Sequence, residues 1–154
     1  MNYNLAIIGG GPAGYDAAAT AAKKGLSVVL FEKSALGGTC LNVGCIPTKT
    51  LLYSSKLYYN AVNGSKYGIK VENPTFEYDK IVSRKNKIIR KLNAGIRSKM
   101  TNNNVTVITG TANVVKNENG IITILCGETE YTAEKLLVCT GSKVAIPPIP
   151  GVDT

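Results

Sequence analysis

Residues 5–32 read LAIIGGGPAGYDAAATAAKKGLSVVLFE. Four apolar residues lead into a glycine-rich turn at 9–14, and the alanine-rich segment 15–24 that follows is typical of a helix. Gly25 is a helix-stop signal, and residues 27–31 have the composition of a second buried strand, which ends at Glu32. This stretch therefore predicts a βαβ unit, with two parallel strands joined by a right-handed crossover.

The glycines of the turn have the GxGxxG spacing of dinucleotide-binding proteins, with a strand before them and a helix after them. Gly9 would permit the tight turn, Gly11 a close approach of the backbone to a pyrophosphate, and Gly14 close packing of helix on strand. Glu32 would accept hydrogen bonds from ribose hydroxyls, and its charge disfavours the 2′-phosphate of NADP. These residues alone leave NAD and FAD both open.

A second motif begins five residues after Glu32, where residues 37–49 read GGTCLNVGCIPTK. Cys40 and Cys45 have four residues between them, and Pro47 suits the first turn of a helix. A thiolate at Cys45 would be stabilised by that helix start and by the ammonium group of Lys49, one turn later. The motif predicts a disulfide that opens and closes during redox chemistry, and the alternative is a structural or adventitious cysteine pair.

The run 37–49 closely resembles the active-site signature of the pyridine nucleotide–disulfide oxidoreductases, the family of dihydrolipoamide dehydrogenase, glutathione reductase and mercuric reductase. It looks most like the dihydrolipoamide dehydrogenases, because the other two tend to carry valine at the positions of Leu41 and Ile46. The resemblance implies that the first glycine motif binds FAD rather than NAD. It also implies that Cys40 attacks the disulfide substrate and that Cys45 is the thiolate facing the flavin.

The resemblance further implies a set of FAD contacts. The glycine motif would hold the pyrophosphate, the acid the adenosine ribose, the segment 110–112 the adenine, and the lysine of the cysteine run the reactive edge of the flavin. Residues 140–142 would make a further FAD contact. The family usually has an alanine just before this segment, where this chain has Cys139. The expected cofactor-binding residues are Gly9, Gly11, Gly14, Glu32, Lys33, Gly38, Thr39, Lys49, Ala112, Thr140, Gly141 and Ser142.

The rest of the chain predicts an α/β fold. We expect helices from Pro47 to about residue 59 and over 78–100, a loop at 63–75, and buried strands at 105–108 and 136–139. Short strands at 112–115, 121–125 and 129–132 predict a small antiparallel meander. The expected fold is a Rossmann-like FAD-binding domain with a parallel sheet and flanking helices over residues 1–145. The proline-rich residues 146–154 would be a linker toward an NAD-binding domain that the chain lacks.

Basic residues dominate the second long helix. The net charge is +8, and eight Lys and Arg residues lie between Lys80 and Lys99, where no acid occurs. We interpret this segment as an amphipathic helix with a solvated basic face, and a partner-docking face is the alternative. No aromatic platform accompanies the charge, so we do not expect nucleic acid as a partner. The apolar positions that recur near helical spacing are Ile81, Ile88, Leu92, Ile96 and Met100.

Other features restrict the class of protein. No apolar run reaches the length of a membrane span, and the first residues lack the basic start of a signal peptide, so we expect a cytoplasmic protein and no membrane contact. Cys126 and Cys139 lie in apolar, strand-like segments and are expected to be buried, reduced thiols. The chain has no histidine and no paired ligand spacing at these cysteines, so no metal site is expected.

The resemblance also implies what is missing. Family enzymes are roughly three times as long on the usual length-to-domain prior, and their acid–base is a histidine from the partner subunit. We therefore expect the N-terminal FAD-binding fragment of a homodimeric enzyme that oxidises protein-bound dihydrolipoamide with NAD. Its partners would be lipoyl-bearing proteins of 2-oxoacid dehydrogenase-type complexes, and the isolated chain would be inactive. A glutathione-type or mercuric-type reductase, or a non-catalytic FAD-binding module, remain alternatives.

Overall fold

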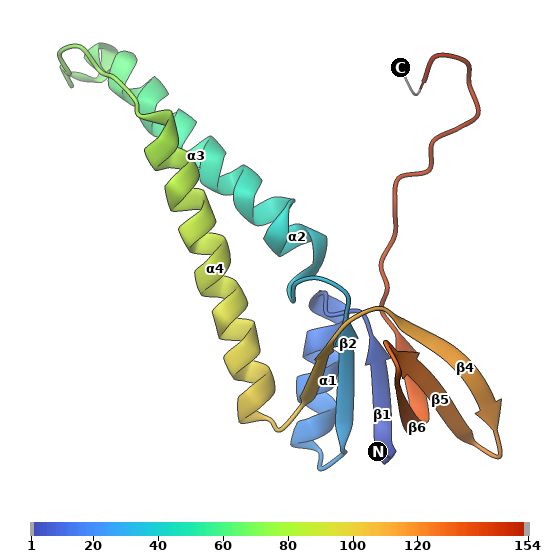
Figure 1. The fold of residues 1–154 in the computed structure, drawn as a ribbon. Helices are drawn as coiled ribbons and strands as arrows, with labels where there is room; N and C mark the ends of the chain where they lie inside the picture. The colour runs from blue at the N-terminus through green and yellow to red at the C-terminus, as the bar shows by residue number, and fades with distance from the viewer. Residues whose placement is uncertain (1, 153–154) are drawn as a thin grey trace.

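The computed structural model describes residues 2–152, and a single six-stranded sheet organises them (Figure 1). The strand order is β3-β2-β1-β6-β5-β4. One long helical arm, made of α3 and α4, projects away from the sheet, while α1 lies against it (Figure 1). The sheet and α1 thus form the body of the domain, and the arm stands out from it.

The βαβ unit predicted from residues 5–32 is present. It consists of β1 (Asn2–Ile8), α1 (Pro12–Lys23) and β2 (Val28–Glu32), with β1 and β2 parallel. The helix begins at Pro12, three residues earlier than predicted, because a proline loses no hydrogen bond in the first turn. It stops where predicted, since Gly25 has φ +87°, a left-handed conformation that suits glycine.

The antiparallel part of the sheet differs from the prediction. Its strands are β4 (Ala112–Glu118), β5 (Ile121–Cys126) and β6 (Thr129–Val138). The two strands predicted at 129–132 and 136–139 are one strand, so that expectation was wrong. Ala133 shows why, because it pairs with Ile122 of β5 on one side and with Tyr3 of β1 on the other. The meander is therefore continuous with the parallel sheet, through β6.

Two apolar clusters lie within the fold. One contains Ile7 and Leu30 of the sheet together with Ala18 of α1 and Met100 of α4. The other contains Phe31, Ile124 and Tyr131, and the Phe31 and Tyr131 rings meet edge to face with centroids 5.1 Å apart. Parallel strands buried on both faces explain the near-continuous apolar runs at 5–8 and 28–31.

The arm carries the cysteine motif at its base. The base is α2 (Gly38–Asn42), and the arm itself runs through α3 (Cys45–Val62), the short 3-10 helix η1 (Gly64–Tyr67) and α4 (Tyr78–Asn102), after which β3 (Thr106–Thr109) rejoins the sheet. The predicted basic amphipathic helix is confirmed in α4. The C-terminal half of α4 is fixed to the body by buried Ile96 and Met100 and by an ion pair between Lys99 and Asp16. Leu92, one of the apolar residues at helical spacing, is exposed.

After β6 the chain leaves the sheet without regular secondary structure up to a turn at 150–152 (Figure 1). Within residues 2–152, no helix has both the length and the apolar character that a membrane crossing requires. The same residues contain no cluster of three or more His, Cys, Asp or Glu side chains that could hold a metal ion.

Candidate cofactor and disulfide site

Several of the predicted site residues lie at the carboxyl ends of the parallel strands. The N–H of Gly9 donates to the carbonyl of Phe31 at 2.8 Å, and the N–H of Gly110 donates to the carbonyl of Glu32 at 2.9 Å. On the other side of β1, the N–H of Cys139 donates to the carbonyl of Ile8 at 2.8 Å. The chain leaves β1 toward β2 on one side, with β6 on the other, which makes this edge the switch point where open α/β sheets bind ligands.

The three motif glycines have different surroundings. Gly9 has φ +109°, and a Cβ there would lie 2.2 Å from the carbonyl oxygen of Cys139. A Cβ on Gly14 would lie 1.8 Å from the carbonyl oxygen of Gly9. Packing within the protein thus accounts for these two glycines. A Cβ on Gly11 meets only the Cα of Gly38 within 4 Å, at 3.7 Å, so the space beside this residue is open.

The start of α1 suits an anion. Gly11 is the N-cap residue and contributes no side-chain hydrogen bond to the first turn of the helix. The N–H groups of that turn have no partner within the helix and carry the positive end of its dipole. A phosphate group approaching the open side of Gly11 would therefore meet free donors.

The Glu32 carboxylate is held in one orientation. Oε2 accepts a hydrogen bond of 2.7 Å from the N–H of Gly10, and Oε1 accepts bonds of 2.9 and 3.2 Å from the N–H and hydroxyl of Ser34. An ionised carboxylate can accept about four hydrogen bonds, so acceptor capacity remains. The side chain is half-buried, and it can present that capacity to ribose hydroxyls.

Two hollows flank this carboxylate, with volumes of about 210 and 290 Å³, and Glu32 and Lys33 line both. The smaller hollow is lined by predicted cofactor-binding residues at the ends of strands. The larger hollow is lined by predicted residues of the cysteine motif. Lys49, Gly141 and Ser142, also predicted as cofactor contacts, line neither hollow. The first is completed by Ile8, Gly9, Phe31, Gly110, Thr111, Ala112 and Thr140, and the second by Ser34, Ala35, Gly38, Thr39, Asn42 and Val43.

A disulfide joins Cys40 of α2 to Cys45, the first residue of α3, with a Cα–Cα distance of 4.6 Å. Cys40 is half-buried and Cys45 is exposed. Gly44 allows the tight connection, because a Cβ there would lie 3.0 Å from the carbonyl oxygen of Thr39. Cys126 and Cys139 are free, but only Cys126 is buried as predicted. Cys139 lies just beyond β6 and is half-buried.

The disulfide-bearing helix packs directly on the glycine turn. The N–H of Gly37 donates to the carbonyl of Gly10 at 2.8 Å. A Cβ on Gly38 would lie only 2.9 Å from the Cα of Gly11, so this approach requires a glycine at position 38. The glycine motif and the cysteine motif are therefore packed against each other.

Sequence reasoning missed one part of the site. Asn42 lies between the two cysteines, and its Oδ1 accepts a hydrogen bond of 2.8 Å from Nδ2 of Asn93 on α4. The two residues are 51 positions apart, and no motif or periodicity connects them. The only available signal was an asparagine at the end of a short helix, inside the cysteine motif.

Comparison with known proteins agrees with this geometry. Residues 3–154 match the family model described as pyridine nucleotide-disulphide oxidoreductase. The chain belongs to this family. Membership implies a flavin cofactor, and both the sheet topology and the disulfide are consistent with it.

Similar proteins of this oxidoreductase family include dihydrolipoyl dehydrogenases from Acholeplasma laidlawii and Bacillus subtilis, each 40% identical over 151 and 141 residues, or 97% and 90% of the chain. These matches cover 44% and 31% of the relatives, so the chain spans less than half of their length. A solved structure of the Cu(II) complex of the HOCl-induced flavoprotein disulfide reductase RclA from Escherichia coli matches with a TM-score of 0.77 and 32% identity. That match covers the whole of this chain and 32% of RclA.

Proposed function

We propose that the chain is the FAD-binding part of a dihydrolipoyl dehydrogenase, in which the Cys40–Cys45 disulfide accepts electrons from protein-bound dihydrolipoamide. One observation carries the proposal, namely the packing of the disulfide-bearing helix against the phosphate-binding turn at Gly11 and Gly38. This packing supports a redox-active pair beside a dinucleotide site. The names of relatives that are 36–40% identical support the choice of substrate.

The residues present fit FAD. The first-turn N–H groups of α1 would hold the pyrophosphate in the space that Gly11 leaves open, and Glu32 would hold the adenosine ribose. The hollow between Gly9, Gly110 and Thr140 would receive the adenine end. We place Lys49, Gly141 and Ser142 toward the flavin end, outside that hollow. When bound, FAD would supply a two-electron acceptor next to the cysteine pair.

The cysteines would react by thiol–disulfide exchange. A substrate thiolate attacks Sγ of Cys40, the Cys40–Cys45 bond breaks, and Cys45 leaves as a thiolate. The second substrate thiol then attacks the substrate sulfur bound to Cys40, which closes the substrate disulfide and releases Cys40 as a thiol. Two electrons and two protons thus pass from the dithiol to the cysteine pair and its surroundings. Cys45, as the first residue of α3, has its thiolate stabilised by the positive end of the helix dipole.

We also propose the division of the chain made from sequence. Residues 1–145 would be the FAD-binding domain, and 146–154 would lead toward an NAD-binding domain, where NAD would take up the electrons in the whole enzyme. The whole enzyme would act in the cytoplasm, as a homodimer serving lipoyl-bearing proteins of 2-oxoacid dehydrogenase-type complexes. The long exposed arm supports the expectation of a homodimer.

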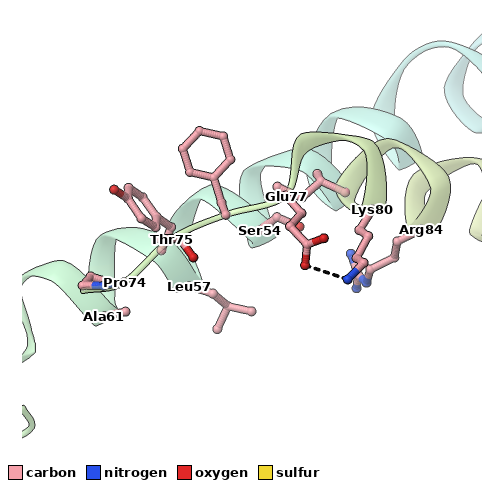
Figure 2. Close-up of a pocket in the computed structure, with 11 residues that line it drawn as sticks. Ser54, Leu57, Ala61, Pro74, Thr75, Glu77, Lys80 and Arg84 are labelled. Atoms are coloured by element: carbon pink, nitrogen blue, oxygen red, sulfur yellow. Dashed lines mark hydrogen bonds and ion pairs between the residues drawn. The ribbon is translucent and has the colours of Figure 1, made fainter. Parts of the chain in front are cut away.

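The arm exposes apolar side chains to an unusual extent for a monomer. Leu52, Leu57 and Tyr59 of α3 are 62%, 53% and 60% exposed. Between α3 and residues 74–84 lies a groove of about 420 Å³, and Figure 2 shows Ala61 and Pro74 toward one end of it and Lys80 and Arg84 toward the other. A second subunit covering this arm would bury the exposed apolar surface.

Two measurements on the purified 154-residue chain test the proposed function. After incubation with FAD and gel filtration, we expect a flavin absorption spectrum in the protein fraction, and failure to retain FAD would count against the site. The reduced chain should re-form its disulfide faster with oxidised lipoamide than with oxidised glutathione. A preference for glutathione would favour the second candidate, another disulfide reductase, which the likeness to RclA supports.

A further inference from the structure

Asn42 occupies the short segment between the two cysteines and binds its surroundings on two sides. Its Nδ2 donates to the carbonyl oxygens of Gly38 at 2.9 Å and Leu36 at 3.0 Å. A side-chain amide has two N–H groups, so both donors are used. The remaining atom, Oδ1, faces away from these carbonyls and accepts the hydrogen bond from Asn93.

Asn93 reaches this segment from a different element. It lies on α4, and the buried side chains of Ile96 and Met100 on the same helix fix that helix to the body. Leu41, the neighbour of Asn42, is buried in the same apolar cluster as Ile96. Apolar packing therefore brings α4 and α2 together, and the Asn42–Asn93 hydrogen bond fixes their orientation at the cysteine loop.

We propose that Asn93 is a positioning residue for the redox-active disulfide, acting through Asn42. The inference rests on the proposed redox role of the cysteine pair. Reduction adds two electrons and two protons, breaks the Sγ–Sγ bond and leaves two thiols. From then on the short main chain between them and non-covalent contacts keep Cys40 and Cys45 close. Among those contacts, the 2.8 Å hydrogen bond from Asn93 ties the side chain of Asn42, within their loop, to α4.

The direction of the effect follows from linkage. The disulfide and the hydrogen bond each hold the loop in the geometry that the other needs, so each favours formation of the other. Loss of the bond from Asn93 would give the dithiol more freedom and make disulfide closure less favourable. The pair would then be easier to reduce, and its reduction potential would become less negative.

The experiment is a redox titration of the purified 154-residue chain. Wild-type protein and variants are equilibrated with mixtures of oxidised and reduced dithiothreitol at one pH, alkylated, and assayed by mass spectrometry for the Cys40–Cys45 disulfide. For Asn93→Ala we expect the equilibrium constant for disulfide formation to fall about tenfold, which corresponds to ~30 mV. Asn93→Asp has nearly the same shape but cannot donate as a carboxylate, so it should show the same loss. Asn93→Gln, which keeps the donor, should recover part of it.

Asn86→Ala is the matched control, because Asn86 is an exposed asparagine on the same helix, two turns earlier. Circular dichroism on each variant verifies that the helices are retained. A shift of less than twofold for Asn93→Ala, a normal titration for Asn93→Asp, or an equal shift for Asn86→Ala would overturn the proposal. A wild-type pair that cannot be reduced and re-formed reversibly would instead count against the proposed redox function itself.

Discussion

The Cα of Gly38 lies 3.7 Å from the position that a Cβ on Gly11 would occupy, an ordinary van der Waals contact. Gly11 itself has φ −73° and ψ −176°, which any residue can adopt. The folded protein therefore has room for an alanine at this position, although the nucleotide-binding motif has glycine there. The feature that excludes a side chain at Gly11 is, in our proposal, the cofactor.

Gly11→Ala should separate folding from cofactor binding. We expect the free energy of unfolding without FAD to change by less than ~1 kcal/mol, since the new methyl group meets no close atom. The dissociation constant for FAD should rise at least tenfold, or ~1.4 kcal/mol, because the methyl group would occupy the approach of the pyrophosphate. Chemical denaturation and a fluorescence titration with FAD measure the two quantities.

Gly14→Ala is the comparison for that variant. Its Cβ would lie 1.8 Å from the carbonyl oxygen of Gly9, so α1 would have to move away from β1. We expect a loss of about 1–3 kcal/mol or more in stability without any ligand present. Unchanged FAD affinity in a well-folded Gly11→Ala protein would show that the pyrophosphate does not bind at this turn.

Glu32→Gln should weaken both the turn and the cofactor site. The carboxylate now accepts hydrogen bonds from the N–H of Gly10 and from Ser34, and an amide would place an N–H group against one of these donors. Hydrogen bonds to a charged group contribute about 1.5–3 kcal/mol, so we expect a stability loss in that range. FAD affinity should fall about tenfold or more, ~1.4 kcal/mol or more.

Glu130→Gln provides the control for the Glu32 variant. Glu130 is exposed on β6, and its substitution removes the same charge. Thermal unfolding and FAD titration are measured on both proteins. Equal effects in the two variants would mean that net charge, and not the oriented carboxylate, determines the result.

The parts of the fold that depend on local sequence were predictable. The turn at 9–14, the helix stop at Gly25 and the acid at Glu32 each follow from neighbours within one βαβ unit, because φ preferences and motif spacing act over a few residues. The basic helix α4 was predicted for the same reason. Its apolar spacing was confirmed at Ile96 and Met100, which are buried.

The parts of the fold that depend on pairing between residues distant in sequence were not predictable. Glu134 and Lys135 look like a break between two strands, but both are exposed positions within β6. The strand continues because β5 pairs with its first half and β1 with its second, a fact that sequence separation hides. Leu92 matches the helical period yet is exposed, whereas Ile89, one turn earlier on α4, packs against the core cluster. Sequence separation also hides the Asn42–Asn93 hydrogen bond, because the two residues are 51 positions apart.

The arm should mediate self-association. We expect Leu52→Ser together with Leu57→Ser to raise the dimer dissociation constant at least tenfold, since burying a leucine contributes about 1.5–3 kcal/mol. Monomer stability should change little, because both side chains are more than half exposed. Sedimentation velocity over a range of concentrations measures the effect. Val144→Ser, at a residue 85% exposed and outside the arm, is the control. A wild-type chain that stays monomeric throughout would refute this use of the arm.

The cysteines should differ in their reactivity toward an alkylating agent. In the oxidised protein Cys139 should be labelled first, because it is half-buried while Cys126 is 8% exposed. Cys40 and Cys45 should be unreactive until the disulfide between them is reduced. Peptide mapping by mass spectrometry reports each site. Rapid labelling of Cys126 in the folded protein would contradict its burial against Gly110.

FAD should change the order of labelling within the reduced pair. Without cofactor, exposed Cys45 should react faster than half-buried Cys40. If Cys45 faces the flavin, bound FAD covers it and slows its labelling by tenfold or more, while Cys40 remains open to substrate and to reagent. Tandem mass spectrometry of the tryptic peptide 34–49, which contains both residues, distinguishes them. Cys126 serves as the internal reference, because its burial does not depend on the cofactor. Protection of Cys40 in place of Cys45 would exchange the two proposed roles, and equal protection would show that FAD covers the whole loop.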